Sequence, residues 1–162
     1  MGLALKQAGG AAIEVEAMRY GAQALGACIE TGAGALPCRS VLHAVGAWNE
    51  VSCIARAPMR ALWLAEERTF RSIALPAIGT GRGRVSLASS ADTIATALRT
   101  HAELGGRLRE VRIVVIDEPS FQVFDETLAG ILMGHEATDE CVADGVDHAT
   151  AATALSGEGA HA

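Results

Sequence analysis

The chain has 162 residues, of which 50% are hydrophobic, and it carries a formal net charge of −6. This length is sufficient for one domain with a buried core. The acidic balance argues against a general DNA- or RNA-binding role, because such a role needs an excess of Lys and Arg to neutralise phosphates. No stretch approaches the ~20 apolar residues of a membrane span, and the N-terminus lacks the apolar core of a signal peptide. We expect a cytoplasmic protein without a nucleic-acid polymer or a membrane as partner.

The cysteines and histidines do not have the spacing of metal ligands. The chain contains Cys28, Cys38, Cys53 and Cys141, and no two of them form a C-x-x-C pair. The histidines of the last 28 residues also lack ligand spacing. We therefore expect free thiols in a reducing compartment, no metal site and no cofactor.

The first third of the chain predicts one helix and two short strands. Over 3–20, apolar residues recur at helical spacing among charged ones, although Gly9 and Gly10 weaken this predicted helix. Residues 25–31 are a candidate short strand that ends at glycines. The compact apolar run over 40–45 (SVLHAV) is typical of a buried strand.

A second helix, a second buried strand and a glycine-rich turn follow. The helix is expected over 54–70, and Pro58 should either lie in its first turn or kink it. Residues 71–77 (RSIALPA) are typical of a buried strand, and residues 78–85 (IGTGRGRV) predict a turn.

The remaining elements are a helix, a strand and a final helix. The first of these helices begins near 87, where Ser86, Ser89 or Ser90 could cap it, and ends near Gly105 and Gly106. The β-branched run over 111–116 (VRIVVI) predicts a strand. The last helix has an apolar stripe formed by Phe121, Phe124, Leu128 and Ile131.

Strands that alternate with helices predict an α/β domain with a largely parallel sheet and helices on its faces. We assign this domain to residues 1–133. Residues 134–162 have no hydrophobic period and are rich in Ala, Thr, Asp, Glu and Gly, so we expect them to form a disordered tail.

The glycine-rich turn is the candidate functional segment. In open α/β sheets, ligands bind beyond the carboxyl ends of the strands. Glycines at such a point let the backbone approach a phosphate, and consecutive amides can form an anion nest beside the positive end of the next helix. Thr80 could donate a hydroxyl, and Arg82 or Arg84 could add charge. The loop has neither the Walker A lysine nor the G-x-G-x-x-G spacing, so a purely structural turn stays an alternative.

Four blocks of the sequence resemble the macro domain family. Residues 72–85 (SIALPAIGTGRGRV) resemble its signature, a strand that ends in Pro-Ala before a Gly-Thr-Gly loop. Residues 41–48 (VLHAVGAW) resemble an Ile-His-x-Val-Gly-Pro strand, and residues 5–17 resemble the first ligand-side helix. Residues 108–118, with the phenylalanines after them, resemble the last strand and helix. The resemblance covers residues 2–132 and implies a three-layer α/β/α sandwich with a mostly parallel central sheet.

This resemblance implies a ligand site at the glycine loop. In the family the loop wraps the diphosphate and distal ribose of ADP-ribose. Carried over by position, the ligand-binding residues are Ala77, Ile78, Gly79, Thr80, Gly81, Arg82, Gly83 and Arg84. The preceding strand end adds Val45, Gly46 and Trp48 as further candidates. Many members have an aromatic residue where this chain has Gly83, which weakens the ribose contact more than the diphosphate contact.

The chain also departs from the family pattern at its N-terminal end. Members usually begin with strands that carry an adenine-reading Asp, followed by a central strand with an Asn-rich loop, and the sequence lacks these features. Hydrolytic members often carry an Asp at the position of Gly2. We therefore expect binding of ADP-ribose, of a related nucleotide diphosphate or of an ADP-ribosylated protein. An ADP-ribosyl hydrolase and a non-binding scaffold that forms homo-oligomers through the incomplete sheet stay open as alternatives.

Three other polar positions favour structural roles. His43 lies within a strand and has no nameable nucleophile or carboxylate partner, so we expect a hydrogen-bonded structural histidine. Asp117 and Glu118 form a carboxylate pair, but their place before Pro119 is typical of a strand-end turn and helix cap.

Overall fold

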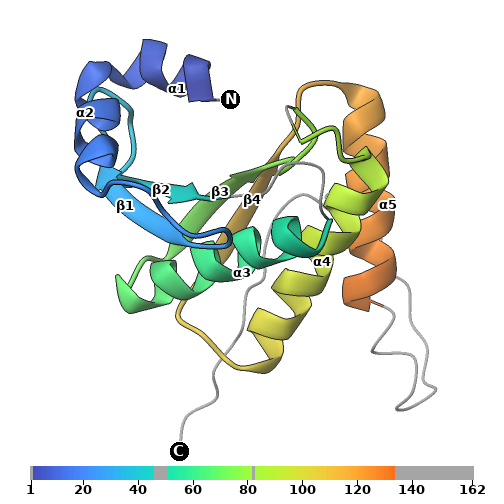
Figure 1. Cartoon of the computed structure of the whole chain (residues 1–162). Coiled ribbons are helices and arrows are strands. Elements are labelled where there is room, and N and C mark those ends of the chain that lie inside the picture. Colours follow the sequence, from blue (N-terminus) through green and yellow to red (C-terminus); the bar gives the residue numbers. More distant parts are fainter. Residues whose placement is uncertain (1, 46–50, 82, 134–162) are drawn as a thin grey trace, which may run out of the picture.

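The computed structural model describes residues 2–45, 51–81 and 83–133. The predicted tail, and the site candidates Gly46, Trp48 and Arg82, lie outside these residues. Helices and strands alternate along most of the chain (Figure 1), which confirms the α/β prediction. In the described part of the chain, no helix is both long and apolar enough to cross a bilayer.

The chain begins with two helices rather than one. α1 spans Gly2–Gly9 and α2 spans Ala11–Arg19. Between them Gly10 has a φ of 88°, a left-handed conformation that interrupts a right-handed helix. The prediction of one continuous helix over 3–20 was therefore wrong at its glycine pair.

The first two strands form an antiparallel pair between two helices. β1 (Cys28–Gly32) pairs with β2 (Ser40–Ala44). α2 packs on this pair, and α3 (Val51–Glu67) contacts it from the other side (Figure 1). Pro58 is fully buried inside α3, which excludes the first of its two predicted places, the first turn of the helix.

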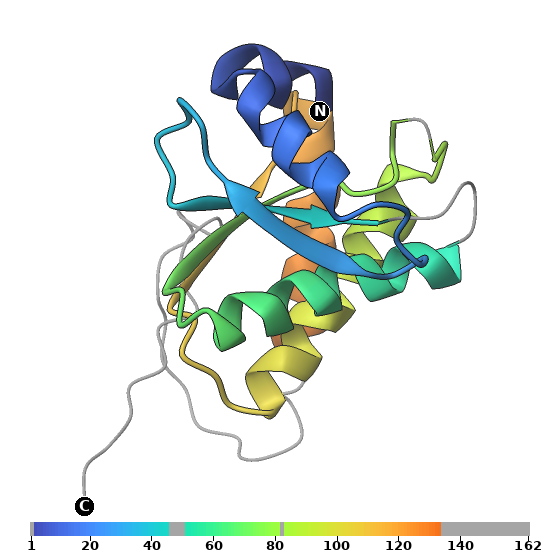
Figure 2. The same ribbon diagram turned by 60° about the vertical axis from the view of Figure 1, so that its left-hand side comes forward.

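The second pair of strands is parallel and carries the glycine loop. β3 (Ser72–Pro76) pairs with β4 (Glu110–Val114). α4 (Leu87–Glu103) connects them, as expected for a βαβ unit. α5 (Glu118–Met133) follows β4 and packs against α4 (Figure 2).

The strands described here form two separate two-stranded sheets, because β2 and β3 share no ladder. The prediction of one mostly parallel sheet therefore needs correction, since β1 and β2 are antiparallel and are not paired with the parallel β3 and β4. The face of β3 and β4 that points away from the helices is open: Val114 is 51% exposed, and Ile116, beyond the end of β4, is 93% exposed. Strands of the buried, apolar type are thus only half covered.

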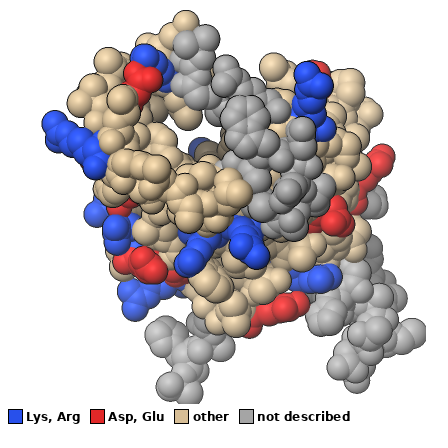
Figure 3. Space-filling model, viewed as in Figure 1, with Lys and Arg blue, Asp and Glu red and all other residues tan. Residues whose placement is uncertain are grey.

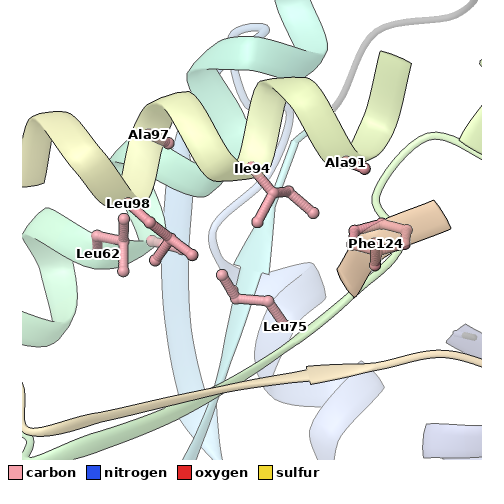
Figure 4. Close-up of a cluster of buried hydrophobic side chains, with 8 residues drawn as sticks. Leu62, Leu75, Ala91, Ile94, Ala97, Leu98 and Phe124 are labelled. Atoms are coloured by element: carbon pink, nitrogen blue, oxygen red, sulfur yellow. The ribbon is translucent and has the colours of Figure 1, made fainter. Parts of the chain in front are cut away.

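The hydrophobic core lies between β3 and the three C-terminal helices. Leu75 of β3 points toward Ile94 of α4, while Leu62 of α3 and Phe124 of α5 flank them (Figure 4). All four side chains are at most 4% exposed. Phe121, predicted in the same apolar stripe as Phe124, is 38% exposed and lies outside this core.

The Glu66 carboxylate binds the turn before β4 to the end of α3. Glu66, near the end of α3, accepts hydrogen bonds from the backbone amides of Arg107 at 2.8 Å and Leu108 at 2.9 Å. Its Oε1 also lies 3.2 Å from Nε2 of the buried His101. A Cβ at Gly106 would be 2.3 Å from the same oxygen, so the turn before β4 fits closely around this carboxylate.

Replacement of Glu66 by Gln should destabilise the fold in a pH-dependent way. Partial burial acts to raise the pKa of Glu66, but the amides of Leu108 and Arg107 and the nearby His101 outweigh it and hold the pKa below its ordinary value. A lowered pKa stabilises the fold above the unfolded-state value, and this contribution is lost as the pH falls through the folded-state value. We expect Glu66→Gln to reduce the unfolding free energy by roughly 1–3 kcal/mol at pH 7, with a smaller difference at pH 3, measured by denaturant titration. An equal difference at both pH values would contradict this account.

Candidate functional site

The glycine loop leaves the carboxyl end of β3 and leads into the N-terminus of α4. Its backbone curls back on itself, since the Val85 amide donates to the Gly79 carbonyl at 3.1 Å and the Arg84 amide donates to the Gly81 carbonyl at 3.1 Å. Gly79 has a φ of 89°, which side-chain-bearing residues rarely adopt. The turn predicted over 78–85 is therefore confirmed as a closed loop.

The glycines of the loop have different roles. A Cβ at Gly83 would lie 2.6 Å from the Gly79 carbonyl oxygen, and a Cβ at Gly79 would lie 2.5 Å from Cδ1 of Ile54 in α3. These two glycines are therefore required for the backbone to close. A Cβ at Gly81 would have no neighbour within 4 Å, so the space next to Gly81 is open to a ligand.

The loop presents backbone donors without acceptors. Within the described residues, the amides of Gly79, Gly81 and Gly83 donate no hydrogen bond. Unpaired amides in a short curled segment, followed by a helix N-terminus, form the kind of nest that binds anions. Ser86, one of the three serines predicted as possible caps, caps α4 by accepting a hydrogen bond from the Ser89 amide at 3.0 Å.

Three of the predicted ligand residues form hydrogen bonds that hold the loop in its conformation. The Thr80 hydroxyl donates to the Ala77 carbonyl at 2.9 Å, so its single proton is not available to a phosphate, and that expectation needs correction. The Ile78 carbonyl accepts from the Ser90 hydroxyl at 2.8 Å. The Ala77 carbonyl therefore bonds within the loop, whereas the Ile78 carbonyl holds the loop on α4.

Val45, predicted with lower weight, holds the β1–β2 hairpin. Its amide donates to the Ala27 carbonyl at 2.8 Å and its carbonyl accepts from the Gly26 amide at 2.8 Å. Arg84 is exposed and has a φ of 51°. Among the described residues of the predicted site, Arg84 is thus the charged one at the loop.

The two other groups with candidate chemistry are structural. His43 Nε2 lies 2.8 Å from the Thr31 hydroxyl, and burial, opposed by the Glu16 carboxylate, lowers the pKa of His43. Asp117 Oδ1 accepts from the Ser120 amide at 3.0 Å, and the hydrogen bonds from Ser120 hold the pKa of Asp117 below its usual range. Both structural interpretations are confirmed.

On the face shown in Figure 3, the described Lys and Arg side chains are interspersed with Asp and Glu. No group of three or more potential metal ligands occurs in the part of the chain that the structure describes. Burial raises the pKa of the half-buried Cys28 thiol to about 11, so this thiol stays protonated at neutral pH.

Sequence reasoning missed two residues that support the loop. Ser90 was considered only as a helix cap, but its hydroxyl holds the Ile78 carbonyl. Ile54 lies directly under Gly79, which explains why a side chain is not tolerated there. Ile54 is the first residue of the helix predicted over 54–70, but no sequence signal pairs it with the loop.

An α/β domain with an amide-lined glycine loop between a strand and a helix defines a class of anion-binding modules. A family model described as Macro domain matches residues 1–94. An uncharacterized protein of Pyrobaculum aerophilum is 33% identical over 81% of this chain and 76% of its own length. The chain belongs to the macro domain family.

Two further comparisons give the extent of the similarity. An uncharacterized protein of Aeropyrum pernix is 40% identical over 58% of this chain, and the alignment spans about half (52%) of that relative. The fold matches a mutant of the Oceanobacillus iheyensis macrodomain with a TM-score of 0.72 at 23% identity, over 81% of this chain and 76% of that one. It matches the Trypanosoma brucei macrodomain in complex with ADP-ribose with a TM-score of 0.72 at 23% identity, over 76% and 54% of the two chains.

Replacement by alanine should affect stability differently at Gly83 and at Gly81. Gly83→Ala places a Cβ against the Gly79 carbonyl, and we expect it to lower the unfolding free energy by about 1–3 kcal/mol. Gly81→Ala has open space and should change the unfolding free energy by less than about 0.5 kcal/mol. Thermal unfolding of both variants beside the wild type measures this difference, and equal stability of the two variants would contradict the described loop.

Proposed function

We propose that this macro domain binds ADP-ribose, or a related nucleotide diphosphate, through the backbone amides of Gly79, Gly81 and Gly83. The observation that carries this proposal is the set of three amides that donate no hydrogen bond to any described residue, in a loop closed by the Val85 amide. A pyrophosphate satisfies such donors, and the open space at Gly81 admits it.

The comparisons support this choice of ligand. The solved structures that share the fold include an Oceanobacillus iheyensis macrodomain with ADP and a Trypanosoma brucei macrodomain in complex with ADP-ribose. A relative over 59% of this chain is part of a human protein mono-ADP-ribosyltransferase. An ADP-ribosylated protein is accordingly the proposed macromolecular partner.

Binding is proposed in preference to hydrolysis. Hydrolysis requires a group that positions or activates a water near the bound diphosphate. The carboxylate considered for that chemistry, Asp117, caps α5, and His43 is committed to Thr31. Neither residue is free to act at the glycine loop.

Replacement of Gly81 by Val provides the test. Its side chain would enter the open space where the diphosphate is proposed to lie, while leaving the fold intact. By isothermal titration calorimetry we expect ADP-ribose binding to the wild type and a loss of at least about 100-fold in Gly81→Val. A matched control is Gly130→Val in α5, where a Cβ also meets no atom within 4 Å. No heat and no thermal stabilisation of the wild type at millimolar ADP-ribose would refute the proposal.

Self-association through the open sheet is a second candidate function. β2 and β3 are not joined by a ladder, and the apolar side chains of Val114 and Ile116 are exposed on the face of β3 and β4. Unpaired strand edges and exposed apolar residues favour pairing with another chain.

Light scattering after size-exclusion chromatography tests this assembly. We expect a dimer whose fraction increases with protein concentration, and a shift toward monomer in Ile116→Asp, because a charge at an interface opposes burial. Glu103→Asp on α4 is a suitable control. A monodisperse monomer at about 100 µM would exclude an assembly of Kd below that value.

A further inference from the structure

Arg84 has an unfavourable backbone conformation. Among the described residues, the non-glycine residues with positive φ are Thr69, at 56°, and Arg84, at 51°. Left-handed backbone is unfavourable for any residue with a Cβ, and such residues often occur at functional sites. Glycine adopts a positive φ without strain, so Gly at position 84 would relieve the backbone strain.

The charge of Arg84 has no partner among the described residues. Its side chain is exposed, and it forms no ion pair or cation–π contact within residues 2–45, 51–81 and 83–133. Its backbone amide donates to the Gly81 carbonyl at 3.1 Å, so the Arg84 side chain leaves the backbone within the loop, three residues from the open space at Gly81. A guanidinium binds phosphate oxygens in a bidentate manner.

The other described residues of the loop offer little to a sugar. Gly79, Gly81 and Gly83 have no side chains, and the Thr80 hydroxyl donates its proton to the Ala77 carbonyl. Amides and a guanidinium recognise phosphate oxygens, whereas selective contact with a ribose needs hydroxyl, amide or aromatic side chains. The groups that the loop presents therefore favour the anionic part of a ligand.

We propose that Arg84 determines specificity, and that its guanidinium makes this loop a site for nucleoside diphosphates as a class, with the distal ribose of ADP-ribose contributing little. This inference rests on the proposed function of the loop. Arg84 then has two opposite effects. Its backbone conformation lowers the stability of the folded protein, and its guanidinium raises the affinity for phosphate.

The variants Arg84→Gly and Arg84→Lys separate these two effects. We expect Arg84→Gly to raise the Tm by about 2–5 °C and to weaken ADP and ADP-ribose alike, each by roughly tenfold at low salt. The wild-type affinities for the two ligands should differ by less than about threefold, and the salt dependence of binding should decrease in Arg84→Gly. Arg84→Lys keeps the charge and should recover part of the affinity without the gain in Tm.

Thr69→Gly is the matched control. Thr69 has the same kind of backbone conformation but precedes β3, whereas the loop follows it. We expect a similar gain in Tm and unchanged affinity. Arg84→Gly with unchanged affinity, or with a loss for ADP-ribose but not for ADP, would overturn this inference while Gly81→Val still tests the loop. Absence of binding of either ligand to the wild type would overturn both proposals.

Discussion

The hydrogen bond from the Val85 amide to the Gly79 carbonyl is the interaction on which the candidate site depends. It brings the two ends of the loop together, and it is possible only because Gly83 has no Cβ to collide with that carbonyl. Within the described part of the loop, the amides of Gly79, Gly81 and Gly83 donate no hydrogen bond, whereas the amides of Thr80 and Arg84 donate to the Ala77 and Gly81 carbonyls. The same close packing that excludes a side chain at position 83 therefore arranges these amides as donors for an anion.

The loop also depends on the core beneath it. Ile54 of α3 fills the space under Gly79, and Ser90 of α4 holds the Ile78 carbonyl. Both helices belong to the hydrophobic cluster around Leu62, Leu75 and Ile94. A rigid α3–α4 pair therefore preorganises the loop, which reduces the ordering cost of ligand binding.

The sequence predicted the elements better than their partners. The strands, the cap at Ser86 and the stop near Gly105 follow from local rules, and each lies close to its predicted position. The sequence did not predict the break between α1 and α2 at Gly10, because apolar residues at helical spacing continue across it. The engagement of Thr80 by Ala77 and the contact of Ile54 with Gly79 depend on three-dimensional packing, and residue type alone does not reveal them.

The division into two sheets has a consequence for stability. β2 and β3 have apolar sequences typical of central strands, but neither is fully covered, and the two pairs of strands are connected through α3. Helix packing rather than a continuous ladder therefore holds the strand pairs in place. The core at Leu75 belongs to β3 and the helices, whereas β1 and β2 depend on α2 and α3. Local unfolding should begin at the antiparallel pair and leave the glycine loop, which is anchored on α3 and α4, ordered for longer.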